Sequence, residues 1–86
     1  MENRYQVFDT EDEKLYLGVE SHYWKVSDAK KVYKDSLVDS EKVDDSIFLE
    51  LARSGEKEVE ATLSIGVEEA ERFALTLLNL CHTIRK

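Results

Sequence analysis

The feature that most constrains the fold is an abrupt change of hydrophobic period near Gly66. Before it, apolar and polar residues alternate over positions 58–65, which is typical of a strand with one buried and one exposed face. After it, apolar residues recur every three or four positions as far as Ile84, which is typical of an amphipathic helix. Glu68 and Glu69 then fall in the first helical turn, where carboxylates favour the positive end of the helix dipole. The sequence therefore predicts a strand that leads directly into a long C-terminal helix with Gly66 as its N-cap.

The apolar stripe of this helix is unusually broad. Its members are Val67, Ala70, Phe73, Ala74, Leu77, Leu78, Cys81 and Ile84, with Leu75 and Leu80 beside them. A stripe of this width must be deeply buried, or covered on a second side by another element or another chain. Because Cys81 lies on the stripe, we expect it to be a small core residue.

The N-terminal part of the chain predicts a β-hairpin. Apolar residues alternate with polar ones over residues 4–8 and again over residues 14–19, with an acidic five-residue loop between the two runs. This loop length places Val7 opposite Leu15, so that the apolar sides of the two strands agree.

The middle of the chain predicts a short helix between two irregular segments. Residues 22–26 favour extended structure, and we expect a third strand or an extended arm there. Ser27 or Asp28 can cap the helix that follows, which ends by Val38. The acidic stretch 39–46 is typical of a connecting loop.

A second hairpin is expected between this loop and the C-terminal helix. Residues 47–52 alternate as a strand, and a three-residue loop ending at Gly55 turns the chain. Glycine at that position suits the left-handed residue of a turn with a bulge. The resulting register places Leu49 opposite Val59 and keeps the apolar residues on one face.

These elements predict an α+β fold in the order β-β-(β)-α-β-β-α. Residues 1–86 are expected to form one compact domain, because a chain of this length supports a single modest core. The simplest architecture is one mainly antiparallel sheet of four to five strands. The short middle helix and the long C-terminal helix would both pack on one face of it.

Charge and composition narrow the classes of function. The formal net charge of −7 disfavours direct binding to a nucleic-acid backbone or to an anionic membrane surface. No apolar run approaches the roughly 20 residues that span a bilayer. With a single cysteine the chain forms no internal disulfide, so we expect a reducing, cytoplasmic location.

The sequence contains no recognisable catalytic or cofactor-binding pattern. His22 and His82 are the only imidazoles, and Cys81, although adjacent to His82, points about 100° away from it on a helix. One cysteine and two scattered histidines fall short of a zinc site, and three glycines form no phosphate loop. We therefore expect no enzymatic activity and no cofactor.

One carboxylate spacing is similar to that of a calcium loop. Its members are Asp9, Glu11, Glu13 and Glu20. The position that must be glycine for the sharp turn is Lys14, and the residues after it alternate as a strand. These carboxylates are therefore expected to be solvated hairpin residues, and no metal site is predicted.

The face of the sheet that the helices leave bare suggests a function. It would display three aromatic residues, Phe8, Tyr16 and Phe48. Isolated surface aromatics are common and need no explanation, but aromatics are also enriched at the centres of protein interfaces. The first hypothesis is a non-enzymatic protein-binding or adaptor domain, acting through this face or through the C-terminal helix. Its partner would be another protein or a second copy of the chain.

The acidic residues suggest a second hypothesis. A line of phosphates could be imitated by the first hairpin tip (Asp9, Glu11, Asp12 and Glu13), the loop from Asp39 to Asp45 with Asp44, and Glu58 and Glu60 on the open face. A small acidic inhibitor from a phage or mobile element blocks a nucleic-acid-binding enzyme in this way. The alternative is that the acidic surface merely keeps a small domain soluble. The sequence leaves these interpretations open.

Overall fold

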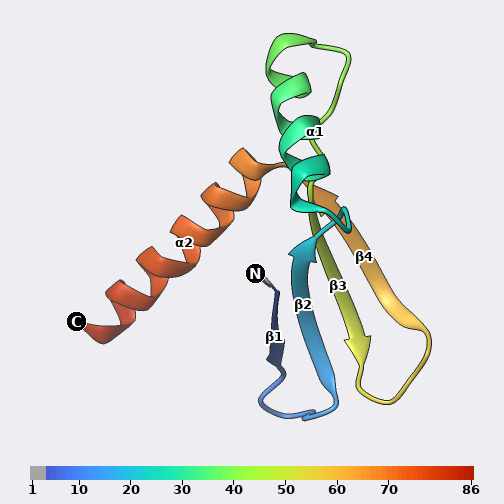
Figure 1. The fold of residues 1–86 in the computed structure, drawn as a ribbon. Helices are drawn as coiled ribbons and strands as arrows, with labels where there is room; N and C mark the ends of the chain where they lie inside the picture. The colour runs from blue at the N-terminus through green and yellow to red at the C-terminus, as the bar shows by residue number, and fades with distance from the viewer. Residues whose placement is uncertain (1–3) are drawn as a thin grey trace.

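The computed structural model describes residues 4–86 and shows a four-stranded sheet with two helices (Figure 1). The elements in chain order are β1 (Tyr5–Phe8), β2 (Leu15–Ser21), α1 (Val26–Val38), β3 (Ile47–Arg53), β4 (Val59–Ile65) and α2 (Val67–Arg85). Neighbouring strands are antiparallel in the order β1-β2-β3-β4. The predicted α+β class is confirmed, with four strands and a long C-terminal helix.

The strand registers give the sheet one strongly apolar face. In the central ladder, Val19 lies opposite Leu49, and Leu49 lies opposite Leu63. Because side chains alternate between the two faces, this row and its neighbours two positions away share one side. We call this side the apolar face; it carries Tyr5, Val7, Leu15, Leu17, Val19, Ile47, Leu49, Leu51, Ala61, Leu63 and Ile65. The opposite side, the polar face, carries Gln6, Phe8, Tyr16, Gly18, Glu20, Phe48, Glu50, Thr62 and Ser64.

Both predicted hairpin registers are wrong, although the apolar positions still match. Val7 lies opposite Leu17 instead of Leu15, because seven residues, and not five, separate the paired residues Phe8 and Tyr16. Leu49 lies opposite Leu63 instead of Val59, because six residues, and not three, separate the paired residues Ala52 and Val59, and β4 holds one extra residue before Ala61. The register also shifts between Leu51 and Ala52. Each slip is an even number of residues, so Val7 and Leu49 keep apolar partners on the apolar face. Val59 is the exception, because beyond the register shift it pairs with Ala52 on the polar face.

The β3–β4 loop contains the turn residue that the sequence indicated. Gly55 has a φ of 86°, the left-handed region that a residue without a Cβ adopts at little cost. In β4, Ala61 pairs with Leu51 and Val59 pairs with Ala52, so Glu60 is the extra residue of a bulge.

The segment between β2 and β3 differs from expectation at its start. Residues 22–25 bend the chain and form no strand. Helix α1 begins at Val26 with Lys25 as its N-cap, so neither Ser27 nor Asp28 caps it. Asp28 lies instead in the first helical turn. The end of the helix at Val38 is confirmed, as is the loop over residues 39–46.

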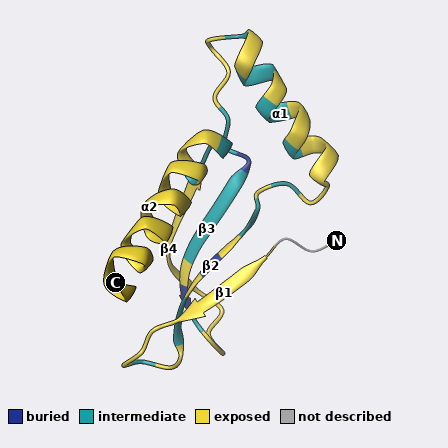
Figure 2. Ribbon diagram, turned by 90° about the vertical axis from the view of Figure 1, so that its left-hand side faces the viewer, coloured by how far each residue is buried: buried dark blue, intermediate teal, exposed yellow. Residues whose placement is uncertain are grey.

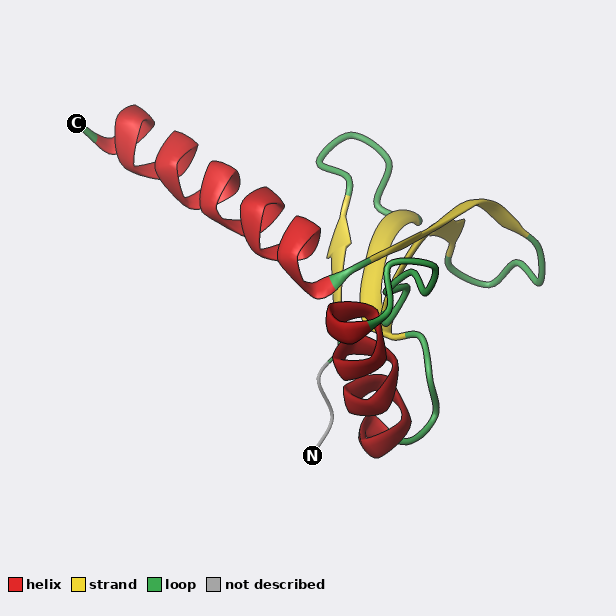
Figure 3. Ribbon diagram, turned by 90° about the horizontal axis from the view of Figure 1, so that it is seen from above, coloured by secondary structure: helices red, strands yellow, loops and turns green. Residues whose placement is uncertain are grey.

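The expected packing of both helices on one face of the sheet is wrong. Helix α1 stands beyond the end of the sheet (Figure 1), and α2 leaves the end of β4 and projects away from the sheet (Figure 3). Neither helix contains a buried residue. Cys81 is exposed, so its assignment to the core is also wrong.

Very little of the described chain is buried (Figure 2). The buried positions are Gly18, Ser46 and Ala52, which lie in or beside the two central strands. The radius of gyration is 15.0 Å, whereas a compact chain of this length has a radius of about 12 Å. The fold therefore leaves its two most apolar surfaces, the apolar face and α2, without a cover.

Candidate protein-interaction surface

A groove runs between the apolar face and the first half of α2. Leu49, Leu63 and Ile65 line it from the sheet, and Phe73 lines it from the helix. Its volume is about 430 Å³, in the range of small ligand or side-chain binding sites. Leu63 is 57% exposed and Phe73 48% exposed, so the groove is open to solvent. Large apolar side chains at this exposure are available for contact with another molecule.

The helix turns its less apolar flank toward this groove. Besides Phe73, the residues of α2 that line it are Glu69, Arg72 and Thr76. Arg72 Nη1 donates a hydrogen bond to Glu69 Oε2 at 2.8 Å, so both charges are engaged within the helix. With 100° per residue, the stripe centred on Leu77 and Cys81 points about 100° away from this flank.

The stripe is accordingly exposed from Phe73 to Ile84. Leu77 is 49% exposed, and Ile84 near the C-terminus is 73% exposed. Leu75, Leu78 and Leu80 are also exposed. The broad stripe that the sequence marked for burial is therefore present as a helix but is not covered by the described part of the chain.

Asp44 fixes the start of α2. Its Oδ2 accepts a hydrogen bond from the Val67 amide at 2.8 Å, and its Oδ1 accepts one from the Ser46 amide at 3.1 Å. Gly66, the N-cap by position, has no side chain to supply this acceptor, and its Cα faces Asp44 so closely that a Cβ there would lie 3.1 Å from Oδ2. Partial burial works against ionisation of Asp44, but the bonds from Val67 and Ser46 outweigh it and hold its pKa below the usual value.

Asp45 connects the loop before β3 to the segment that follows β2. The Tyr23 hydroxyl donates a hydrogen bond of 2.6 Å to Asp45 Oδ1, and His22 Nδ1 lies 2.8 Å from the Asp45 carbonyl oxygen. The bond to Asp45 raises the pKa of Tyr23, because ionised tyrosine cannot donate it. The His22 ring stacks on Phe48 with 5.6 Å between centroids. Asp44 and Asp45, predicted to bind a partner, thus serve the fold at this junction.

The three aromatics of the polar face do not form one patch. Phe8 and Tyr16 pack together with 5.5 Å between ring centroids. Phe48 lies four residues before Ala52, the partner of Tyr16, in β3, which corresponds to about 13 Å. The sequence therefore placed the three residues on the correct face without revealing that they occupy its opposite ends.

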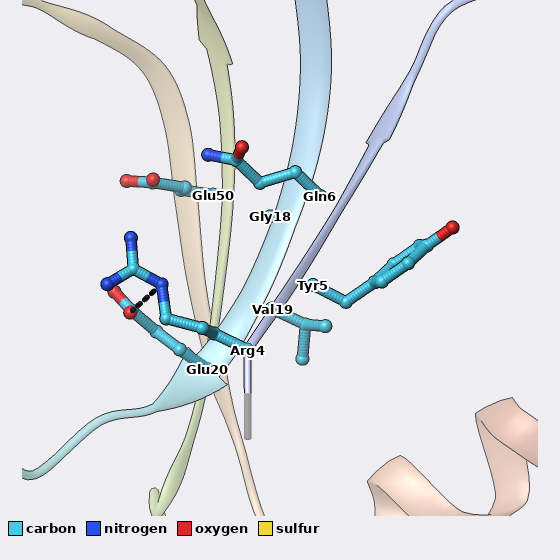
Figure 4. Close-up of a pocket in the computed structure, with 7 residues that line it drawn as sticks. All are labelled: Arg4, Tyr5, Gln6, Gly18, Val19, Glu20 and Glu50. Carbon is cyan, nitrogen blue, oxygen red and sulfur yellow. Dashed lines mark ion pairs between the residues drawn. The ribbon is translucent and has the colours of Figure 1, made fainter. Parts of the chain in front are cut away.

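Charged and polar side chains of the polar face, among them Gln6, Glu20 and Glu50, line a small pocket (Figure 4). Arg4 Nε lies 3.9 Å from Glu20 Oε2, and the Tyr16 hydroxyl lies 3.5 Å from Glu50 Oε1. A small pocket of about 20 Å³ opens where Gly18 has no side chain, room for about one water molecule. The middle of the polar face is thus charged and nearly filled.

The remaining predicted acidic residues are separated. Glu60, from the bulge of β4, accepts a hydrogen bond from Arg53 Nε at 3.3 Å, and Arg53 Nη1 also pairs with Asp12 of the first hairpin. The Arg53 bond lowers the pKa of Asp12. Glu58 lies in the β3–β4 loop. No common line of Asp44, Asp45, Glu58 and Glu60 results.

The acidic residues of the first hairpin shape a turn. Asp9 Oδ2 accepts hydrogen bonds from the amides of Glu11 and Asp12, and Asp12 Oδ1 accepts one from Lys14. Within residues 4–86, no three histidine, cysteine or acidic side chains are grouped so that they could hold a metal ion. The same range contains no helix with the length and hydropathy needed to cross a membrane.

The chain matches no protein-family model, no curated protein sequence and no solved structure. Its function must therefore be argued from its own residues. Sequence reasoning identified the apolar stripe of α2 but missed the groove, because it assumed that the helix would cover its own sheet. It also missed the cap from Asp44, which lies 23 residues from Val67 and leaves no local spacing signal.

Proposed function

We propose that the protein is a non-enzymatic protein-binding domain whose binding surface is formed by α2 together with the apolar face of the sheet. The observation that carries this proposal is the exposure of both surfaces on either side of one groove. Apolar patches of this kind on a folded protein mark sites of interaction with other proteins. The location expected for this activity is the cytoplasm, as the unpaired Cys81 suggests.

The available energy supports a protein partner. Burial of a side chain such as Phe73 or Leu77 in an interface contributes about 1.5–3 kcal/mol relative to leaving it in water. An amphipathic helix in an apolar groove is a recurrent mode of protein recognition. Leu49 and Leu63 give the groove an apolar floor against which a helix of a partner can pack.

The polar face is a weaker candidate for the same role. Interface hot spots cluster in well-packed, desolvated centres, whereas Glu20 and Glu50 lie between the aromatic ends of this face. We therefore favour α2 as the binding surface over the face that carries Phe8, Tyr16 and Phe48.

The acidic inhibitor that imitates nucleic acid remains the alternative function. Charges on Glu11, Glu13, Glu41 and Glu58 support it, since all four residues are exposed. Against it, the carboxylates of Asp44, Asp45 and Glu60 accept hydrogen bonds from within the chain. A mimic needs its charges free to meet the cationic site of an enzyme.

Affinity capture from the source cell with three matched bait variants tests the proposal. Leu77→Glu places a charge on the stripe of α2, Phe48→Ala removes an aromatic of the polar face, and Glu58→Lys reverses an exposed charge. Asn79→Glu, on the polar strip of α2, is the control for Leu77→Glu. We expect only Leu77→Glu to lose the captured protein, and we expect retention to depend weakly on salt.

If only Phe48→Ala loses the captured protein, the binding surface is the polar face. Loss through Glu58→Lys, with steep weakening by salt, would favour the acidic mimic. Either result would overturn the assignment of α2 as the binding surface.

A further inference from the structure

The surface of the chain is too large for a protein of its mass. A compact chain of 10.0 kDa exposes about 5,200 Å², whereas this chain exposes 7397 Å². The excess is about 2,200 Å² for each chain, or about 4,400 Å² for two chains. Obligate homodimers bury about 2,000–5,000 Å² in total, so a second copy would account for the excess.

The direction of α2 prevents it from covering its own sheet. The flank that lines the groove carries Glu69, Arg72 and Thr76 beside Phe73, while Leu77 and Cys81 point about 100° to one side of it. Asp44 anchors the first amide of the helix, at Val67, to the loop before β3. The apolar stripe is thus presented outward, where another chain can meet it.

The charges along α2 are arranged for pairing with an identical helix in the opposite direction. Glu68, Glu69 and Glu71 lie near its N-terminus, and His82 and Arg85 lie in its last turn. A twofold axis across the helix would place the acidic end of each copy beside the basic end of the other. The two helix dipoles would then also run antiparallel, which is the favourable arrangement.

The length of α2 also matches the length of the apolar face. Helix α2 has 19 residues, which gives a length of about 28 Å. Strands β2, β3 and β4 have seven residues each, which gives about 23 Å. A second α2 can therefore extend along the full length of the apolar face.

We propose that the partner of this surface is a second copy of the same chain, with the two α2 helices packed antiparallel between the two apolar faces. This inference rests on the proposed function and names the occupant of the binding surface. Closed twofold dimers are the commonest homo-oligomers, and such an interface uses the same patch on both copies. Each α2 would place its stripe against the sheet of the other copy and complete the core that one chain lacks.

Light scattering of the full chain after size-exclusion chromatography tests this inference. We expect twice the chain mass of 10.0 kDa for the wild type and for Asn79→Glu. We expect the single-chain mass for Leu77→Glu at the same concentration, with helix content checked by circular dichroism. Should Leu77→Glu lose its helix, Leu63→Lys on the apolar face, with Thr62→Lys on the polar face as its control, gives the same comparison from the sheet side.

A wild type with the mass of one chain at hundreds of micromolar would overturn the inference, and so would a Leu77→Glu variant that stays dimeric and folded. A fluorescent dye for apolar surfaces, anilinonaphthalene sulfonate, then distinguishes the two proposals. A monomer that binds the dye, and loses it in Leu77→Glu, keeps the binding surface of the proposed function but not the homodimer. A monomer that does not bind the dye has closed α2 over its own sheet, and both proposals fail.

Discussion

Replacement of Asp44 should release the start of α2, because this carboxylate is the acceptor for the Val67 amide. Loss of a side-chain cap costs about 0.5–2 kcal/mol. Asp44 also accepts a bond from the Ser46 amide, so Asp44→Ala should lie toward the upper end of that range. A loss of about 1 kcal/mol lowers Tm by about 4–8 °C in a domain of this size. At about 1.5–2 kcal/mol, we therefore expect Asp44→Ala to lower Tm by about 6–16 °C.

Two further variants separate the contribution of the Asp44 hydrogen bond from that of the Asp44 charge. Asp44→Asn keeps an oxygen acceptor and should cost only about 0.3–1 kcal/mol, the contribution of a charge at a helix N-terminus. Glu56→Gln removes a charge from the exposed β3–β4 loop and should leave Tm unchanged. Thermal melts by circular dichroism, at one fixed protein concentration because association shifts Tm, provide the comparison. Equal melting temperatures for Asp44→Ala and Glu56→Gln would refute the cap.

The pH dependence provides an independent check on the same residue. Because the pKa of Asp44 is lowered in the folded chain, its ionised form stabilises the fold fully above the pKa of an unfolded aspartate, about 3.9. This stability is lost as the pH falls through the lower folded pKa. The wild type should therefore lose its advantage over Asp44→Asn in acid, and an advantage that persists there would contradict the charged cap.

Three smaller effects should follow from the geometry. Gly55→Ala should cost about 1 kcal/mol in denaturant melts, because a Cβ is unfavourable at positive φ, while the adjacent Ser54→Ala should be nearly neutral. Tyr23 should ionise above its usual pKa in an ultraviolet titration, and its stabilising bond to Asp45 should persist at neutral pH and disappear as the pH rises through that raised value; Asp45→Asn should return the titration toward that of free tyrosine. Millimolar calcium or a chelator should leave Tm nearly unchanged, whereas an increase of several degrees with calcium would indicate a metal site in the acidic first hairpin.

The elements of this fold were predictable because they depend on local patterns. Alternation over residues 58–65 predicted the strand that is observed as β4, and the change of period placed the start of α2 directly after Gly66. Strand registers were less accessible, because seven and six residues separate the paired strand ends in place of the shorter turns. Leu49 still lies opposite an apolar residue despite that error, because a register shift by an even number of residues keeps it among side chains of the same face.

The tertiary arrangement of α2 could not be read from the same patterns. An apolar stripe shows that a helix face needs a cover but does not say which chain supplies it. The contact that directs α2, from Asp44 to Val67, joins positions 23 residues apart. The candidate site, between Leu63 and Phe73, arises from this direction and therefore appears only in three dimensions.

The reactivity of Cys81 measures the central claim most directly, because this single thiol lies on the stripe of α2 and is exposed in the isolated chain. A chromogenic aromatic disulfide in excess reports its rate of modification, with the urea-unfolded chain as the unprotected reference. If a second copy covers the stripe, Cys81 should react slowly at hundreds of micromolar protein and faster on dilution, and Leu77→Glu should react fast throughout. A rate equal to that of the unfolded chain at every protein concentration would contradict the account.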